Sequence, residues 1–265
     1  MVNFESSDKY GVEDLRRLIK LLRSPEGCPW DQEQTHLSIR RNFLEEAYEA
    51  VEAIDENDPL HLREELGDVL TQVVFHADIE DDAGTFDLDD VADAVVRKLL
   101  FRHPHVFGDV TVSGSGEVLQ NWDELKRVEK SQSTVSDSLS SVAKSLPALW
   151  RAEKIQKKAA KVGFDWEDVS GAFDKLREEV DELDAAIVSG DLERAFFELG
   201  DVLFSAVNVA RRIGADPEDA LSASSDMFVA RFSKMEEMVS GAGLTLAGMS
   251  AEEMDVWYRR AKRLL

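Results

Sequence analysis

The feature that most constrains this chain is an internal repeat with an offset of 133 positions. Five acidic residues of the first half recur in the second half with no insertion or deletion between them, and the run Glu-Leu-Gly-Asp-Val-Leu occurs at 65–70 and again at 198–203. A repeat unit of this length is a domain, not one turn of a solenoid. The sequence therefore predicts two related domains in tandem, and the matching acids are Glu45, Glu46, Glu49, Glu65 and Asp68, then Glu178, Glu179, Glu182, Glu198 and Asp201.

Apolar residues recur at helical spacing through most of the chain, for example at positions 15, 18, 19 and 22 and again at 69, 70, 73 and 74. This periodicity predicts an all-α fold. Asp58-Pro59 combines a capping side chain with a proline at the first helical position, and so predicts a helix that ends near Asp55 and another that begins near Pro59. Gly190-Asp191 marks the same break in the second copy. Each copy is therefore expected to form an antiparallel helical hairpin.

The predicted domains cover residues 1–135 and 136–265. Serine and threonine are frequent at 131–145, so we expect a linker there. Glycine and proline punctuate residues 102–116, which predicts an irregular loop. Two domains of this size each have enough residues to bury a core.

The composition excludes several classes of partner. A net charge of −23 over 265 residues argues against a surface for nucleic acid or an anionic membrane, because either needs clustered Lys and Arg. Cys28 is the one cysteine, so no intrachain disulfide can form and a reducing cytoplasm is the expected location. The acidic, polar start does not resemble a signal peptide, and no run of 18 apolar residues suggests a membrane span.

The repeated acids lie three or four positions apart, which places them on one face of each helix, beside the apolar residues that must pack. Carboxylates gathered there repel one another unless a cation compensates them. All-oxygen ligands favour Mg²⁺, with Mn²⁺ as the alternative. A di-iron site would need Glu-x-x-His on two helices, whereas the chain offers only Glu33-x-x-His36, which we expect outside both hairpins. A zinc site at His103-x-His105 lacks further ligands at a recognisable spacing.

At these acids the chain resembles the MazG nucleoside triphosphate pyrophosphohydrolase family, whose signature is Glu-Glu-x-x-Glu followed at a set distance by Glu-x-x-Asp. The resemblance covers nearly the whole chain. Three other segments are also similar to the family: Gly27-Cys28-Pro29-Trp30 through His36, Arg102-His103-Pro104-His105 through Asp109, and Lys154-Ile155-Gln156-Lys157 through Trp166.

The resemblance implies helical-bundle domains that dimerise, Mg²⁺ as cofactor, and hydrolysis of nucleoside triphosphates such as ATP to the monophosphate and pyrophosphate. By similarity the second domain is the catalyst. Its Mg²⁺ ligands would be Glu179, Glu182, Glu198 and Asp201, with Glu178 as a supporting residue and candidate base. The first domain would hold a second metal site at Glu46, Glu49, Glu65 and Asp68. Nucleotide contacts would come from Lys175, Arg194, Arg231, Trp257 and Lys262, although Met227 stands where the family commonly has Lys.

Other interpretations stay open on the residues alone. The acids could be solvated faces of an acidic interaction or regulatory protein that docks a basic partner. The first half could be a regulatory domain and the second half the catalyst. Lys175 and Arg231 could form ordinary surface ion pairs, and Trp257 could pack in a core. Base and sugar preference are not predicted, because they depend on the shape of a pocket.

Overall fold

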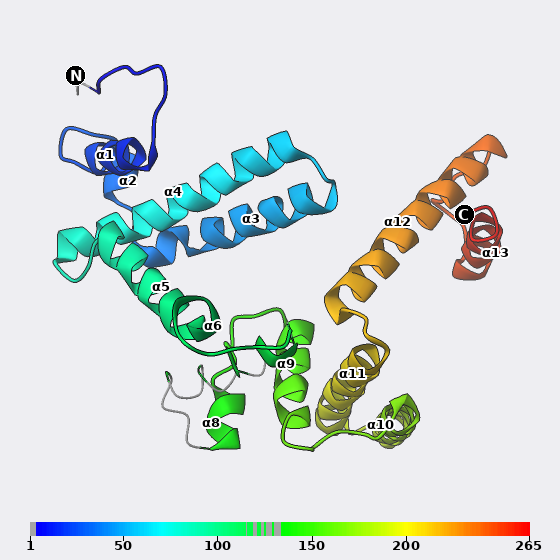
Figure 1. The fold of residues 1–265 in the computed structure, drawn as a ribbon. Helices are drawn as coiled ribbons and strands as arrows, with labels where there is room; N and C mark the ends of the chain where they lie inside the picture. Colours follow the sequence, from blue (N-terminus) through cyan, green and yellow to red (C-terminus); the bar gives the residue numbers. More distant parts are fainter. Residues whose placement is uncertain (1–3, 115, 119–120, 123–124, 126–128, 130–133) are drawn as a thin grey trace. The chain divides into compact units, whose positions relative to one another are not determined.

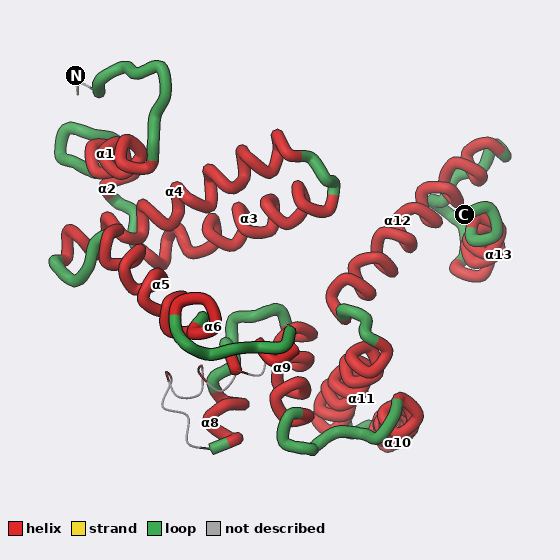
Figure 2. Tube along the Cα trace, viewed as in Figure 1, coloured by secondary structure: helices red, strands yellow, loops and turns green. Residues whose placement is uncertain are grey.

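The computed structural model describes residues 4–114, 116–118, 121–122, 125, 129 and 134–265. The chain divides into two compact units, residues 1–126 and 127–265. This division lies before the boundary predicted at residue 135. All the regular secondary structure of the described residues is helical, so the all-α prediction is confirmed (Figure 2).

The first unit contains six described helices (Figure 1). Helices α3 and α4 form a hairpin, and α1 packs against α4. The bounds are α1 Val12–Leu22, α2 Pro29–Gln32, α3 His36–Asp55, α4 Pro59–Ala83, α5 Leu88–Arg102 and α6 Pro104–Phe107.

The break between α3 and α4 falls where the sequence predicts it. The side chain of Asp58 accepts hydrogen bonds from the backbone N–H groups of Leu60 and His61, and Pro59 is the first residue of α4. These caps satisfy N–H groups that have no partner within the helix. His36 is the first residue of α3, so the expectation that it lies outside the hairpin is wrong. Thr35 is the N-terminal cap of α3, and the residues around it lack the helical periodicity that would have predicted a helix start there.

The core of the first unit lies between α1 and the end of the hairpin away from the connecting loop. Ile19 of α1, Ile39 of α3 and Val74 and Phe75 of α4 form one buried cluster. Arg23, which directly follows α1, forms an ion pair with Asp78 and another, at 2.8 Å, with Asp82. These contacts fix the orientation of α4, and with it the position of Glu65.

The second unit repeats the hairpin as α10 and α11 and adds helices on either side in sequence. Gly190 ends α10 in the left-handed conformation with φ 76°, and Asp191 caps α11, as the sequence predicts. The bounds are α8 Val135–Ser140, α9 Ala148–Ala160, α10 Val169–Ser189, α11 Leu192–Ile213, α12 Pro217–Gly241 and α13 Ala251–Ala261.

Two segments that the sequence predicts to be irregular contain short helices in the structure. The predicted linker includes α8, which packs on α9 and is capped by Thr134, whose Oγ1 accepts from the N–H of Asp137. The predicted loop at 102–116 includes α6, which starts at Pro104. Serine-rich and proline-rich strings favour caps as well as loops, and a short helix leaves too few residues for a periodic pattern.

Helix α9 lies against the hairpin of the second unit. The Nε2 of Gln156 donates a 2.8 Å hydrogen bond to the carbonyl oxygen of Phe204, in the middle of α11. Trp150 Nε1 donates to Asp216 Oδ1 at 2.9 Å, and Asp216 also caps α12. Met235 and Val239 of α12 form a small core with Ala261 of α13.

Candidate metal centres on the two hairpins

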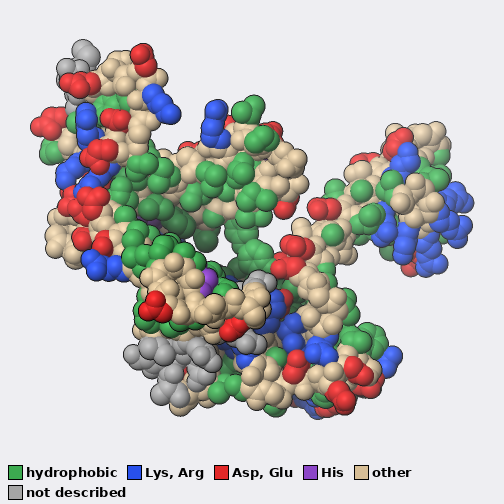
Figure 3. All heavy atoms as spheres, viewed as in Figure 1, with side chains coloured by type: hydrophobic (Ala, Val, Ile, Leu, Met, Phe, Trp, Pro, Cys, Tyr) green, Lys and Arg blue, Asp and Glu red, His purple; other side chains and the backbone are tan. Residues whose placement is uncertain are grey.

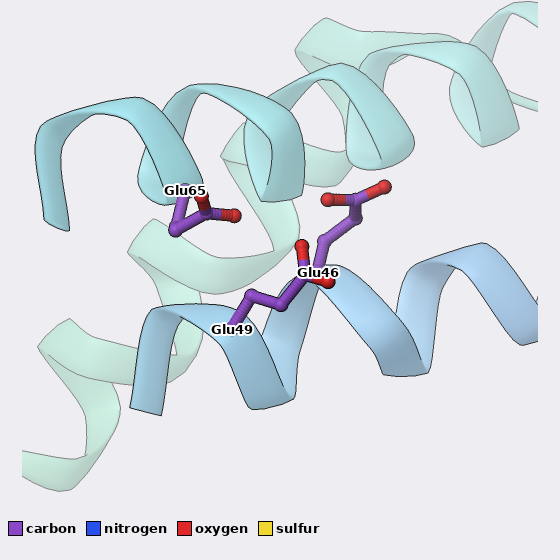
Figure 4. A group of neighbouring side chains, drawn as sticks. All are labelled: Glu46, Glu49 and Glu65. Carbon is purple, nitrogen blue, oxygen red and sulfur yellow. The ribbon is translucent and has the colours of Figure 1, made fainter. Parts of the chain in front are cut away.

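The first hairpin gathers three glutamates at the place predicted by the repeat. Glu46 and Glu49 of α3 point towards α4, and Glu65 of α4 faces them (Figure 4). One carboxylate oxygen from each residue lies within 4.8 Å of the other two. Helical spacing explains this, since Glu46 and Glu49 are three positions apart on one helix face. The hairpin turn then brings Glu65 opposite them.

The environment of this group disfavours negative charge. Glu65 is 8% exposed, and its Oε2 is buried without a hydrogen-bond partner among the described residues. Burial and the neighbouring charges of Asp68, Glu49 and Glu65 raise the pKa of Glu46. Burial, followed by the charge of Glu49, also raises the pKa of Glu65. A divalent cation bound between these oxygens would relieve both the repulsion and the unsatisfied oxygen.

The second hairpin gathers the equivalent residues. Oxygens of Glu179 and Glu182 on α10 and of Glu198 on α11 lie within 4.8 Å of one another. Glu179 is 7% exposed. The charge of Glu198, then burial, raises the pKa of Glu182. The sequence repeat therefore produces two acidic groups of the same composition, each built from one hairpin.

Basic side chains distinguish the two groups. Lys175 Nζ lies 2.7 Å from Glu178 Oε1 and 2.9 Å from Glu179 Oε1. Arg194 Nε donates to Glu198 Oε1 at 2.9 Å. The carboxylates of the second hairpin are thus partly neutralised by two permanent cations on the same helices.

The first hairpin has neither of these two cations at the matching positions. At an offset of 133 positions, Asn42 corresponds to Lys175 and His61 corresponds to Arg194. His61 Nε2 lies 3.2 Å from Glu65 Oε1. His61 was not singled out in the sequence analysis. The repeat could have identified it, because His61 lies at the position that aligns with Arg194.

Other predicted site residues lie outside the two groups of three. Asp68 and Asp201 are exposed, each three positions after the clustered glutamate of its helix, and the charge of Asp68 reaches Glu46. Glu178 is exposed and accepts its hydrogen bond from Lys175. Three positions on the second hairpin, Lys175, Glu178 and Arg194, are therefore linked to the glutamates, as neighbours of the candidate metal ligands.

The remaining predicted nucleotide contacts are on α12 and at the end of the chain. Trp257 packs beside the small core of α12 and α13, and the guanidinium of Arg260 lies 4.9 Å from the centre of its ring. Arg231 is half-buried, and its Nε has no hydrogen-bond partner within the described parts of the chain. Lys262 is exposed just after α13, where Lys and Arg side chains gather at the surface (Figure 3). No ion pair among the described residues joins these three to the glutamates.

Comparisons with known proteins identify the family of this chain. Residues 34–107 match the MazG nucleotide pyrophosphohydrolase domain. The chain is 44% identical over 250 residues to a Thermotoga maritima protein named nucleoside triphosphate pyrophosphohydrolase/pyrophosphatase MazG, covering 94% of this chain and 95% of that protein. It is 42% identical over 258 residues to the Escherichia coli nucleoside triphosphate pyrophosphohydrolase, covering 95% and 97%.

A Bacillus subtilis protein, named uncharacterized protein YabN, is 50% identical over 248 residues; the match covers 93% of this chain and 50% of that protein. Such identity over nearly the full length shows the family. The chain belongs to the MazG nucleotide pyrophosphohydrolase family, a family of hydrolases. Among the helices that the structure describes, none combines the length and the hydropathy that a membrane span requires.

Proposed function

We propose that the protein is a Mg²⁺-dependent nucleoside triphosphate pyrophosphohydrolase whose active site is on the second hairpin. The observation that carries the proposal is the convergence of Glu179, Glu182 and Glu198 beside Lys175 and Arg194. The carboxylates suit a hard divalent cation, and the two basic residues suit phosphate oxygens. The printed names of the Thermotoga and Escherichia relatives support this substrate class.

Glu179, Glu182 and Glu198 would hold the cation, with Asp201 reaching it from the exposed next turn of α11. Carboxylate oxygens are the donors that Mg²⁺ prefers, and Mn²⁺ accepts the same set. The bound cation would supply charge neutralisation to the triphosphate and its leaving group. Glu46, Glu49, Glu65 and Asp68 offer the same donors on the first hairpin.

The reaction is hydrolysis at the α-phosphorus. A water oxygen forms a bond to that phosphorus while the bond to the oxygen that bridges the α and β positions breaks. Pyrophosphate leaves with the bonding electron pair, and the nucleoside monophosphate remains. The water proton passes to a carboxylate, for which we propose Glu178, because it borders the group without being one of the three converging ligands. Lys175 would move from Glu178 and Glu179 to a phosphate oxygen when the cation arrives.

We further propose that the protein is a homodimer. Helix α11 carries exposed Phe196, Phe197, Leu199 and Leu203 around Gly200, and a Cβ at Gly200 would meet nothing within 4 Å. The described part of the chain therefore leaves open space beside α11 at Gly200. Hydrophobic side chains reach the surface in both units (Figure 3), and large exposed apolar patches mark association sites.

The second copy is the preferred catalyst over the first because its converging glutamates are paired with Lys175 and Arg194, where the first copy has Asn42 and His61 at the matching positions. A role in removing unwanted triphosphates or in lowering nucleotide levels under stress would follow from such an activity. The cytoplasm is the proposed location, since Cys28 is a free thiol.

The direct test is an assay of monophosphate and pyrophosphate release from a panel of nucleoside triphosphates, with Mg²⁺, with Mn²⁺ and with EDTA. We expect stoichiometric release of both products with either metal and none with EDTA. Release of orthophosphate would contradict the site of cleavage. Absence of any hydrolysis across the panel would instead favour the acidic interaction protein.

A further inference from the structure

A second polar cluster lies on the first hairpin, away from the glutamates. His36 Nδ1 and His76 Nδ1 are 2.7 Å apart, and His36 Nε2 lies 2.7 Å from Glu80 Oε1. The two imidazole rings are nearly parallel, with an interplanar angle of 8°. His36 is the first residue of α3, whereas His76 and Glu80 are on α4. The cluster therefore ties the start of one helix to the far part of the other.

The contact between the two Nδ1 atoms requires one proton between them. With no proton, two lone pairs would face each other, and with two protons, two N–H groups would collide. The contact to an ionised Glu80 requires a proton on His36 Nε2. Two states satisfy both conditions. Either both rings are neutral, with His76 Nδ1–H donating to His36, or one ring carries a single positive charge.

A second positive charge is incompatible with the cluster. If both rings were imidazolium ions, each Nδ1 would carry a proton and the 2.7 Å contact could not persist. Burial, then the nearby His36, lowers the pKa of His76 below its ordinary value of 6.5. His36 also sits at the amino end of α3, where the helix dipole disfavours positive charge.

Glu80 is the carboxylate that faces this pair. Its other oxygen accepts a hydrogen bond from Thr85 Oγ1, and hydrogen bonds from Thr85 and His36 lower its pKa. Phe43 of α3 contributes an aromatic edge to His76, with no charge.

The other acids near this part of α4 form ion pairs with a basic residue of α1 and with the residue that caps its carboxyl end. Arg23 pairs with Asp78 and Asp82, and Lys20 pairs with Asp81 at 2.6 Å. At the start of α5, Asp87 and Asp89 pair with Arg16. The acids from these packed elements are therefore paired elsewhere.

The second hairpin provides an internal comparison. At the offset of 133 positions, Val169, Val209 and Ile213 replace His36, His76 and Glu80. Val169 is the first residue of α10, as His36 is the first residue of α3. The same hairpin therefore forms with three apolar residues at these positions. The fold does not require the polar cluster, whereas the glutamates of the candidate metal centres are identical in both copies.

We infer that His36, His76 and Glu80 form a pH-sensitive clasp between the start of α3 and α4. The clasp is closed while the two histidines together carry at most one positive charge. It opens when both histidines are positively charged. The open end of the first hairpin is thereby made sensitive to acidification. The second hairpin lacks this property, because its equivalent residues do not titrate.

The direction of the effect follows from linkage. A histidine whose pKa is lowered in the closed form binds its proton more readily in the open form. Protons therefore favour opening as the pH falls below about 6.5, the ordinary value for histidine. The lowered pKa of Glu80 adds to this loss only at lower pH, below its ordinary value of 4.5. The first loss of the clasp is therefore due to the histidines.

The first test reads the tautomers in the full-length wild type. The chain has five histidines, so selective ¹⁵N-histidine labelling resolves them in two-bond ¹H–¹⁵N spectra. At pH 8 we expect one histidine of the pair as the Nδ1–H tautomer, which is the minor form of free histidine. His36→Val and His76→Val assign the signals. Finding both rings as Nε2–H tautomers would overturn the clasp, and this readout does not depend on a variant folding.

The second test follows amide hydrogen exchange at pH 8 and pH 5.5, corrected for the intrinsic rate. Protection in the first turn of α3 should fall about tenfold in the wild type, which corresponds to one pKa unit. The variant His36→Val/His76→Val/Glu80→Ile, which copies the second hairpin, should show no such fall. An equal fall in both proteins would overturn the inference. Stabilisation by micromolar Zn²⁺ in the wild type alone would also overturn it, and would make the cluster a metal site.

Discussion

Lys175 Nζ bridges Glu178 Oε1 and Glu179 Oε1 at 2.7 and 2.9 Å, so its ammonium group is paired with carboxylate oxygens at the candidate metal centre. The hydrogen bonds that Lys175 donates to Glu178 and Glu179 raise the pKa of this lysine, which keeps it charged. A cation that uses Glu179 must compete with Lys175. The same displacement would free the lysine for a phosphate oxygen.

Lys175→Met should therefore separate metal binding from turnover. We expect the affinity for Mn²⁺ without nucleotide to rise roughly two- to fivefold, the effect of removing one partly exposed ion pair. Hydrolysis of triphosphates should fall about tenfold, because a charge-assisted contact to phosphate is lost. Electron paramagnetic resonance of free Mn²⁺ measures the first effect, and product release measures the second.

A matched control is Lys234→Met, since Lys234 makes the same kind of ion pair to Glu237 three positions away, at 2.7 Å on α12. It should change neither quantity. If Lys175→Met weakened Mn²⁺ binding, the lysine would be supporting the carboxylates instead of competing for them.

Equivalent substitutions in the two copies should have unequal effects on activity. Glu198→Ala removes one of three converging carboxylates beside Arg194, and we expect at least about a 100-fold loss of turnover, the size found when groups that support a metal are removed. Glu65→Ala removes the matching carboxylate of the first copy and should retain most of the activity. Steady-state assays with saturating Mg²⁺ measure both. Loss of activity in Glu65→Ala alone would move the catalyst to the first hairpin.

The loop that carries the first of the sequence signatures should tolerate no side chain at Gly27. A Cβ there would collide with the carbonyl oxygens of Leu21 and Leu22, and both are backbone atoms that cannot move aside cheaply. Gly27→Ala should lower the free energy of unfolding by about 2 kcal/mol or more. Gly114→Ala is the control, because a Cβ at Gly114 would meet nothing within 4 Å. Urea denaturation followed by circular dichroism compares them, and equal stabilities would contradict the close packing.

Local signals in the sequence were sufficient for the hairpins and their glutamates. Asp58 and Pro59 are adjacent residues that together mark where one helix ends and the next begins. Helical spacing places Glu46 and Glu49 on one face. The exact repeat then locates the second centre. Each of these inferences needs only neighbouring residues or a fixed offset, which is why the structure agrees with them.

Contacts between distant residues could not be predicted in this way. His36 and His76 meet because α3 and α4 pack in one particular register, and no spacing rule links positions 40 residues apart. The environment of Trp257 likewise depends on how α13 packs against α12.

The crowding of charge around Glu182 should be measurable as stability. Its pKa is raised above the ordinary value of 4.5, chiefly by the charge of Glu198, so the native state holds this proton more tightly than the unfolded chain does. Stability from this group is therefore present at low pH and is lost as the pH rises through the raised pKa. In metal-free buffer at pH 7.5, Glu182→Gln should raise the thermal midpoint, and the gain should shrink towards pH 4.5.

Mg²⁺ should stabilise the wild type more than Glu182→Gln, because only the wild type keeps all three ligands. Asp184→Asn, an exposed change of equal charge on the same helix, should show neither effect in thermal melts with EDTA and with Mg²⁺. A lower midpoint for metal-free Glu182→Gln would mean that Glu182 makes favourable contacts that outweigh the repulsion.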